Sequence, residues 1–377
     1  MVMHMFFDII IIGSGPAGAH LSYLLSRAGM KVALVDRMQF PREKLCGGLL
    51  TQKTIDILSS AYPCWNISGY KINQAHVFLE NELMISANMR SSLCTIERFG
   101  FDSALSTMAE ESGACRFLEN ALVSIDFLNN EVLLKNGQKL GYSCLVGADG
   151  ANSRVRFLCG LPRNSLGFCV EAHVPWNKIN ENLSLLNNGV EIFYSNEYKG
   201  YAWVFPSQDS VAIGCGNIIA GMNEKNTLNA FQRFMQNSTS EDVIKPRGCY
   251  IPSGESVALG HPEFDNVYLI GDAAGLIDPV TGEGIYYALL SAEILAKSIL
   301  SQENKVSKYK ALMSDVISGI QANLNMRNRL HDFSILGNLL ISLKQVPEYG
   351  EQLIDETVSR YEKTYWQAVK ELEYLIR

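Results

Sequence analysis

The sequence I-I-I-I-G-S-G-P-A-G, residues 9–18, is the stretch that decides the fold of this chain. Four consecutive isoleucines predict a buried strand, and the apolar residues from Ala17 to Leu25 recur at helix spacing. Gly13 permits a tight turn between them, Gly15 lets the backbone approach a pyrophosphate, and Gly18 lets helix and strand pack closely. The helix N-terminus, beginning near Pro16, adds amide donors and a favourable dipole.

A second apolar strand, residues 32–35, ends at Asp36, and Arg37 follows it. An acidic side chain at this distance from the glycine turn can bind ribose hydroxyls. A glycine-rich turn alone occurs in many loops, but together with the strand, the helix and Asp36 it predicts a dinucleotide site.

A late segment, G-D-A-A-G at residues 271–275, favours FAD over NAD as the dinucleotide. Residues 266–270 predict a buried strand that delivers Asp272 at its carboxyl end, where ligands sit in open α/β sheets. Asp272 can accept hydrogen bonds from a chain of sugar-like hydroxyls; the alternative is a helix cap before Ala273. Gly282 and Gly284 precede a predicted helix from Ile285, whose N-terminus can stabilise the negative charge of a reduced flavin.

Composition excludes several classes of function. The 377 residues are 47% hydrophobic, enough for a sizeable core, and the net charge of −7 argues against nucleic-acid binding. Nine cysteines without C-x-x-C pairing indicate reduced thiols, and the six histidines show no metal-binding spacing. No signal peptide is evident, and no apolar run reaches the ~20 residues needed to span a bilayer. We therefore expect a cytoplasmic protein without metal, for which peripheral contact with a membrane stays open.

The order of segments predicts an α/β fold: a Rossmann-like FAD-binding domain interleaved with an antiparallel β-sheet substrate domain, followed by a helical C-terminal tail. The FAD-binding domain is expected to comprise residues 1–64, 97–160 and 251–304. The substrate domain is expected to comprise residues 65–96 and 161–250, where short strands dominate. Residues 305–377 form the predicted tail, with helices at 326–343 and 353–375.

Three stretches together carry a family pattern: P-R-E-K-L-C-G-G at residues 41–48, Y-A-W-V-F-P at 201–206, and the segment from Gly271 to Gly284. The chain resembles the geranylgeranyl reductase-like flavoproteins, in the fold group of p-hydroxybenzoate hydroxylase and the single-component flavin monooxygenases. The resemblance covers roughly residues 5–300 and departs at Leu49, where the reductases often have a third glycine.

The resemblance implies roles for further residues. Arg98 would contact the cofactor, Asp272 would bind its ribityl or pyrophosphate region, and Asp149 matches the D-G-x-x-S-x-V-R pattern that contacts FAD and, in the monooxygenases, the nicotinamide cofactor. With the residues derived above, the predicted cofactor-binding set is Gly13, Gly15, Pro16, Ala17, Gly18, Asp36, Arg37, Cys46, Gly47, Gly48, Arg98, Asp149, Gly271, Asp272, Gly282, Gly284 and Ile285.

Three residues are candidates for catalysis. The resemblance places Cys46 in the loop facing the isoalloxazine ring, where its thiol could relay electrons, protonate a substrate carbon or only fill space. Gly47 and Gly48 then allow close backbone approach. Tyr201 and Trp203 alternate along one strand and share a face that turns either to a ligand or to ordinary packing.

The predicted function is that of an FAD-dependent oxidoreductase whose substrate lies between the sheet and the isoalloxazine ring. Saturation of an isoprenoid or lipid double bond and hydroxylation of an aromatic ring are both open. A further alternative is modification of a protein-bound tryptophan while the quinone cofactor of a partner oxidase matures. No second G-x-G-x-x-G follows a strand, so NAD(P)H or another external electron donor would bind without a domain of its own.

Overall fold

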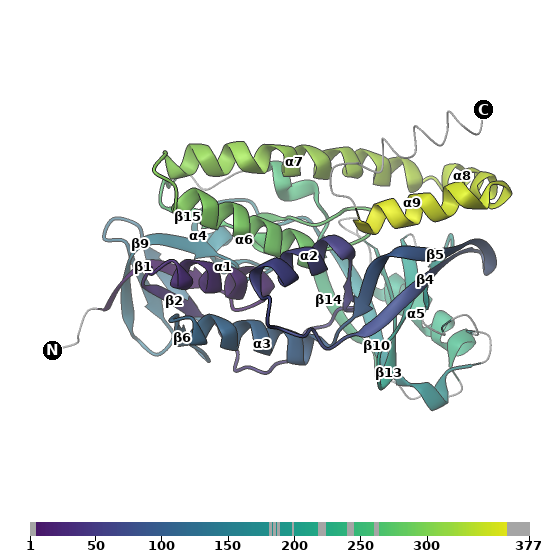
Figure 1. The fold of residues 1–377 in the computed structure, drawn as a ribbon, viewed down its shortest axis with the longest axis horizontal. Helices are drawn as coiled ribbons and strands as arrows, with labels where there is room; N and C mark the ends of the chain where they lie inside the picture. The colour runs from purple at the N-terminus through teal and green to yellow at the C-terminus, as the bar shows by residue number, and fades with distance from the viewer. Residues whose placement is uncertain are drawn as a thin grey trace.

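A computed structural model describes residues 5–180, 183, 186, 189–197, 200–217, 224–239, 245–259 and 264–359. Two β-sheets lie side by side along the long axis of the molecule, with helices above and below them (Figure 1). The mixed α/β fold expected from the sequence, with a Rossmann-like part and C-terminal helices, is confirmed.

The first sheet has the order β6-β2-β1-β9-β8-β7, with β15 also paired to β9. Its members β1, β2, β6, β9 and β15 run parallel, and β7 and β8 form an antiparallel extension. Their bounds are Met5–Ile12 (β1), Val32–Val35 (β2), Cys115–Phe117 (β6), Leu122–Asp126 (β7), Glu131–Leu134 (β8), Lys139–Gly147 (β9) and Val267–Leu269 (β15).

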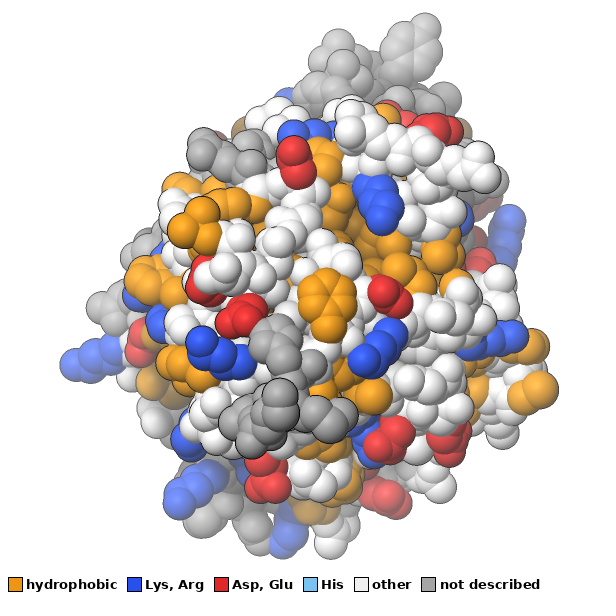
Figure 2. Space-filling view, turned by 90° about the vertical axis from the view of Figure 1, so that its left-hand side faces the viewer, with side chains coloured by type: hydrophobic (Ala, Val, Ile, Leu, Met, Phe, Trp, Pro, Cys, Tyr) orange, Lys and Arg blue, Asp and Glu red, His pale blue; other side chains and the backbone are white. Residues whose placement is uncertain are grey.

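Helices cover this sheet and bury β1 on both faces. Ile9 and Ile11 pack into one apolar cluster and Ile10 and Ile12 into another, which explains the uninterrupted isoleucine run. The helices here are α1 (Pro16–Arg27), α2 (Gln52–Ala61), α3 (Arg98–Glu111), α4 (Arg154–Leu158), α6 (Ile285–Ile299) and the short 3₁₀ helix η4 (Gly271–Ala274). On the described part of the face in Figure 2, positive and negative side chains are interspersed, so no field of one sign forms there.

The second sheet has the order β14-β10-β13-β12-β11-β4-β5-β3. Its strands are Leu49–Leu50 (β3), Tyr70–Leu79 (β4), Glu82–Thr95 (β5), Leu166–Pro175 (β10), Gly189–Tyr194 (β11), Tyr201–Pro206 (β12), Ser210–Asn217 (β13) and Arg247–Pro252 (β14). The pairs within 161–250 are antiparallel, as predicted, but β4 pairs with β11 in parallel. Helix α5 (Glu224–Ser238) and the 3₁₀ helix η1 (Trp176–Lys178) pack on the face opposite the first sheet.

The C-terminal part is helical, but its divisions differ from the prediction. Helices α7 (Lys305–Leu330), α8 (Phe333–Gln345) and α9 (Pro347–Ser359) follow one another, and the 3₁₀ helix η3 (Glu255–Leu259) lies under α7. The predicted helix 326–343 is broken at His331, because Asp332 caps α8 by accepting the N–H of Ser334 at 2.9 Å. Residues 360–375 of the other predicted helix lie outside the described residues.

Candidate functional site: a dinucleotide cradle facing an aromatic sheet

Two glycines of the 13–18 turn are required by close approach of the backbone. Gly13 has φ +106°, and a Cβ added to it would lie 2.3 Å from the carbonyl oxygen of Ala148. A Cβ on Gly18 would lie 1.9 Å from the carbonyl oxygen of Gly13. At Gly15 the nearest atom to an added Cβ is Arg42 Nη2, at 3.7 Å, so the space above this glycine is open. The turn is therefore closely packed at Gly13 and Gly18 and open at Gly15. We call the groups around this open space, from the 13–18 turn to the Gly271–Asp272 turn, the dinucleotide cradle.

The N-terminus of α1 opens into the same space. Pro16 and Ala17 begin the helix, and no side chain caps it, so its first amides and its dipole are available to an anion. Asp36 is directed back to the turn: its carboxylate accepts the N–H of Ser14 at 2.7 Å and that of Met38 at 2.8 Å. Arg37 beside it is exposed. Asp36 thus orders the glycine turn in addition to any ligand contact.

Beside Gly15 lies a group of two arginines and one aspartate. Arg98 makes a two-pronged hydrogen bond to the fully buried Asp102, with both distances 2.7 Å, and Arg42 lies 3.2 Å from the same carboxylate. Two positive charges share one negative charge, so the group has a net positive charge. Sequence reasoning singled out Arg98 but missed Arg42 and Asp102, although Arg42 lies within the P-R-E-K-L-C-G-G stretch.

The Gly271-Asp272 turn completes this side of the cradle. Gly271 has φ +55° and packs against Ala17 of α1, while Asn164 donates to the carbonyl of Asp272 at 2.9 Å. No donor within the described chain reaches the half-buried Asp272 carboxylate. Burial raises the pKa of Asp272, and the nearby positive charges of Lys44 and Arg98 partly offset this. An acceptor left without a donor at this edge suits a hydroxyl-bearing ligand.

Asp149 lies next to the cradle but has a different set of partners. Its Cα is 2.8 Å from where a Cβ on Gly13 would stand. Both carboxylate oxygens are occupied, because Ser153 Oγ and the N–H groups of Arg154 (2.6 Å) and Val155 (3.1 Å) donate to them. In this structure Asp149 therefore caps α4.

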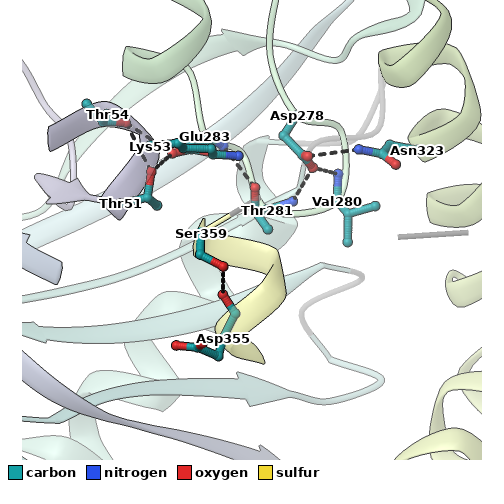
Figure 3. A network of polar contacts seen from close by, with 10 residues as sticks. All are labelled: Thr51, Lys53, Thr54, Asp278, Val280, Thr281, Glu283, Asn323, Asp355 and Ser359. Carbon is teal, nitrogen blue, oxygen red and sulfur yellow. Dashed lines mark hydrogen bonds and ion pairs between the residues drawn. The ribbon is translucent and has the colours of Figure 1, made fainter. Parts of the chain in front are cut away.

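A rigid loop joins Asp278 to the start of α6 (Figure 3). Asp278 accepts the N–H groups of Val280 and Thr281 at 2.8 and 2.9 Å, and Asn323 of α7 donates to its other oxygen at 3.0 Å. Glu283 pairs with Lys53 of α2 at 2.7 Å. The loop is thus held from two helices before it reaches the N-terminus of α6.

Gly282, Gly284 and Ile285 form that N-terminus. Gly282 has φ +74°, Gly284 precedes the first helical residue, and no side chain caps the helix. The added Cβ of Gly284 would lie 3.3 Å from Asp272 Oδ1. The N-terminus of α6 and Asp272 therefore lie at the same place.

The loop carrying Cys46, Gly47 and Gly48 lies against the second sheet. A Cβ on Gly47 would lie 2.7 Å from the Phe205 ring and 3.2 Å from Trp203 Nε1. Gly48 has φ +73° and approaches the carbonyl of Ile96, and its N–H lies 3.4 Å from Cys46 Sγ. The half-buried Cys46 therefore stands between the cradle and the aromatic face of β12.

Tyr201, Trp203 and Phe205 do share that face, and their side chains pack in one cluster. The Tyr201 hydroxyl donates to the carbonyl of Thr281, which ties β12 to the loop before α6. A cavity of about 260 Å³ begins at Tyr201 and runs toward the α7–α8 corner. Its lining combines apolar and aromatic side chains with the polar side chains of Asn217, Arg327 and His331; the former include Tyr194, Val280, Leu330, Phe333 and Leu336.

Comparison with known proteins identifies the dinucleotide. The family model described as "FAD binding domain" matches residues 7–307, most of the chain. The chain belongs to this FAD-binding family. An uncharacterized protein of Methanosarcina barkeri, Mbar_A1602, is 32% identical to this flavoprotein over 352 residues, covering 91% of this chain and 87% of the relative.

Other relatives of the flavoprotein have reductase names. The menaquinone reductase of Mycolicibacterium smegmatis is 26% identical, covering 78% of this chain and 76% of that protein. The digeranylgeranylglycerophospholipid reductase of Methanococcus vannielii is also 26% identical, covering 82% and 85%. These relatives confirm the resemblance to the geranylgeranyl reductase-like family, and the flavoprotein is an FAD-dependent oxidoreductase.

Solved structures share the fold of the flavoprotein. A geranylgeranyl bacteriochlorophyll reductase-like protein of Thermoplasma acidophilum has a TM-score of 0.77 at 20% identity, covering 99% of this chain and all of that one. The flavin-dependent brominase Bmp2 has a TM-score of 0.72 at 17% identity, covering 98% and 99%. Among the described residues, no cluster suits a metal ion and no helix is long and apolar enough to cross a membrane.

Proposed function

We propose that this FAD-dependent oxidoreductase reduces a carbon–carbon double bond of an isoprenoid lipid or a prenylated quinone. The observation that carries the proposal is the cavity next to Tyr201 and Val280, because its wall continues from the aromatic face of β12 to apolar side chains of α7 and α8. Such a space suits an elongated apolar group whose one end reaches the flavin. The reductase names of two relatives support the same chemistry.

The residues of the cradle fit FAD. The open space above Gly15, the uncapped α1 and the Arg42–Asp102–Arg98 group would hold the pyrophosphate, with Asp36 and Arg37 at the adenosine end. The unpartnered Asp272 carboxylate would accept hydroxyls of the ribityl chain. The α6 N-terminus and the Cys46–Gly48 loop would border the isoalloxazine ring, and Asp149 would support the cradle through α4.

When bound, FAD supplies the redox chemistry, taking electrons from an external donor, NAD(P)H or another reductant, and passing them to the substrate. The chain's own residues would bind and orient the substrate. Tyr201 and Trp203 would form its wall, and Cys46 is placed to donate a proton from its thiol. We assign the substrate domain to residues 65–96 and 161–250, since both contribute strands to one sheet, and place the protein in the cytoplasm with peripheral access to lipid.

The test is a single turnover without oxygen. Protein reduced with dithionite is mixed with menaquinone, or with digeranylgeranylglycerol phospholipid in detergent micelles, and the visible flavin absorbance is followed. We expect faster flavin reoxidation with one of these substrates than in its absence. We also expect a product that, after any quinol has been reoxidised to the quinone in air, keeps two extra hydrogen atoms per saturated prenyl double bond. Leu336→Phe should slow the reaction by narrowing the cavity, whereas Leu340→Phe, one turn later on α8 and outside the cavity lining, should not.

If neither substrate accelerates reoxidation, and an aromatic substrate gains an oxygen atom when air is admitted, the protein is a monooxygenase and the reductase proposal is wrong. The fold is shared with both kinds of enzyme, so it does not separate them. No feature of the described chain favours a protein substrate.

A further inference from the structure

The Trp203 indole crosses the second sheet from β12 to β10. It lies over Gly214 of the intervening strand β13, where an added Cβ would come within 2.3 Å of the ring. Its Nε1–H donates to Oε2 of Glu171 on β10 at 2.9 Å. Trp203 is 8% exposed and Glu171 1%. The ring is therefore fixed by a glycine beneath it and a buried carboxylate at its edge.

Trp203 also faces the loop of residues 41–48 that carries Cys46, Gly47 and Gly48, which we call the cofactor loop. A Cβ added to Gly47 would lie 2.7 Å from the Phe205 ring and 3.2 Å from Trp203 Nε1, so the two aromatic side chains together favour glycine at that position. The indole and the Phe205 ring thus both limit how closely the loop approaches the sheet. A change in the orientation of the indole would therefore change the distance between this loop and the second sheet.

The second oxygen of Glu171 has a partner at the surface. Glu171 Oε1 lies 3.3 Å from Nε2 of His173, two residues along β10, and the His173 side chain is 49% exposed. The nearby Glu171 carboxylate raises the pKa of His173, burial opposes this, and the charge of Glu97 adds to it. A protonated His173 neutralises the buried Glu171 carboxylate. Without it, the carboxylate would be stabilised only by the neutral N–H group of Trp203.

Other titratable groups lie around this pair on the neighbouring elements. Arg247 is the cross-strand neighbour of Glu171 on β14, but its guanidinium pairs with Glu43 of the cofactor loop. Other titratable groups that interact with this cluster include Glu97 near His173, the thiols of Cys169 and Cys249 near Glu171, and Cys46, Lys44 and Asp272 near Cys249. Among the described residues, His173 is the cation whose nitrogen lies within ion-pair distance of Glu171.

We propose that Glu171 is a positioning residue, which holds the Trp203 indole against the cofactor loop and depends on protonated His173 for its counter-charge. The inference rests on one part of the proposed function, namely that the face of β12 carrying Trp203 borders the flavin and the substrate. Since His173 gains its partner in the folded protein, the ion pair is present at low pH and is lost as pH rises through the pKa of folded His173. Above that pH a net negative charge stands beside the loop.

The first test needs neither substrate nor turnover. The Trp203 indole N–H is observed by ¹H–¹⁵N NMR in protein without FAD and with FAD, as pH is raised. We expect its resonance to titrate together with the His173 ring, and to stop titrating in Glu171→Gln and His173→Gln. His173 is at the surface, so the second variant keeps the test valid if Glu171→Gln does not fold. A resonance that is indifferent to pH in the wild type would overturn the proposal.

The second test uses the loaded enzyme. Trp203→Phe removes the N–H donor, and Trp176→Phe is the matched control, because Trp176 Nε1 also donates within this sheet, to the carbonyl of Ser207 at 3.0 Å. We expect Trp203→Phe to lower kcat/KM by roughly tenfold, as loss of a charge-assisted hydrogen bond implies, and to shift the flavin midpoint potential. Equal effects of the two variants on that potential would contradict the positioning role, whatever the substrate proves to be.

Discussion

Three aspartates at the ends of parallel strands look alike in the sequence but differ in their partners. Asp36 and Asp149 each accept backbone N–H groups of the chain itself, whereas Asp272 receives no donor from any described residue. A buried carboxylate without a donor from the chain has an unfavourable free energy until a ligand donates to it. Such a carboxylate therefore contributes most to binding that ligand. Of the three, Asp272 is therefore the residue on which FAD retention should depend most.

Replacing Asp272 with alanine should weaken FAD binding by roughly tenfold to a hundredfold, since a hydrogen bond to a charged group contributes about 1.5–3 kcal/mol. Cys46→Ser changes at most a reacting group. It should therefore leave the dissociation constant for FAD within about twofold of the wild-type value. Both constants can be measured by titrating the apoprotein with FAD and following flavin fluorescence. Equal loss of FAD in the two variants would contradict both assignments.

His20 of α1 makes the folded state sensitive to acid. Its ring is fully buried and contacts the Tyr62 hydroxyl at 2.9 Å, and burial lowers its pKa from 6.5 to about 3. Between these values the unfolded chain binds a proton that the folded chain does not, so stability falls as pH falls below 6.5. The slope is at most about 1.4 kcal/mol per pH unit.

His20→Gln keeps a hydrogen-bonding group near Tyr62 but cannot titrate. Urea unfolding at a series of pH values from neutral to mildly acid should show the wild type losing stability faster than the variant by up to the slope above. Identical slopes for the two proteins would show that His20 binds a proton as readily in the folded state as in the unfolded chain, and would contradict the lowered pKa.

Helices and strands were predicted correctly where a few neighbouring residues determine the element. The Ile9–Ile12 run, the alternation in Tyr201–Pro206 and the glycines before Ile285 each determine their own element, and the structure has β1, β12 and α6 there. The break between α7 and α8 was missed, because an aspartate cap inside a long apolar pattern is a weak local feature.

The missed part of the site depends on contacts between distant elements. Arg42 and Asp102 are far apart in sequence and meet only because α3 lies under the cofactor loop. Asp149 was predicted as a cofactor contact from a family motif, yet its local sequence also supplies the Ser153 cap that occupies it. Similarly, Glu171 and Trp203 come together only through the strand order β10-β13-β12, which alternation cannot reveal. Sequence locates the strand ends; packing decides which polar groups are left for a ligand.

Across the whole molecule, the C-terminal helices join the two sheets. Helix α7 runs along the long axis above both (Figure 1), and its Asn323 holds the loop before α6. Helix α9 lies on β5, and its Ile354 and Val358 belong to the apolar cluster that contains Trp203 and Phe205. The helical region is thus a structural wall of the proposed substrate site, because it covers the sheet face opposite α5.

Among the described residues, Asp355 gives α9 a polar anchor on β5. Asp355 accepts the N–H groups of Arg90 and Ser91 on β5, at 3.1 and 3.0 Å (Figure 3 shows Asp355 on α9). Asp355→Ala should cost about 0.5–1.5 kcal/mol in the docking of α9, because two backbone donors near the surface lose their acceptor. Glu351→Ala removes the same charge one turn earlier, at a residue for which the described chain shows no partner, and is the matched control.

The measurement is amide hydrogen exchange, combined with substrate kinetics. In Asp355→Ala the amides of Arg90, Ser91 and α9 should exchange faster than in Glu351→Ala, while the amides of β1 and α1 keep their protection. If α9 forms the wall, KM for the accepted substrate should rise without a loss of FAD, since the cradle lies on the other sheet. Faster exchange with an unchanged KM would show that α9 stabilises β5 but does not border the substrate.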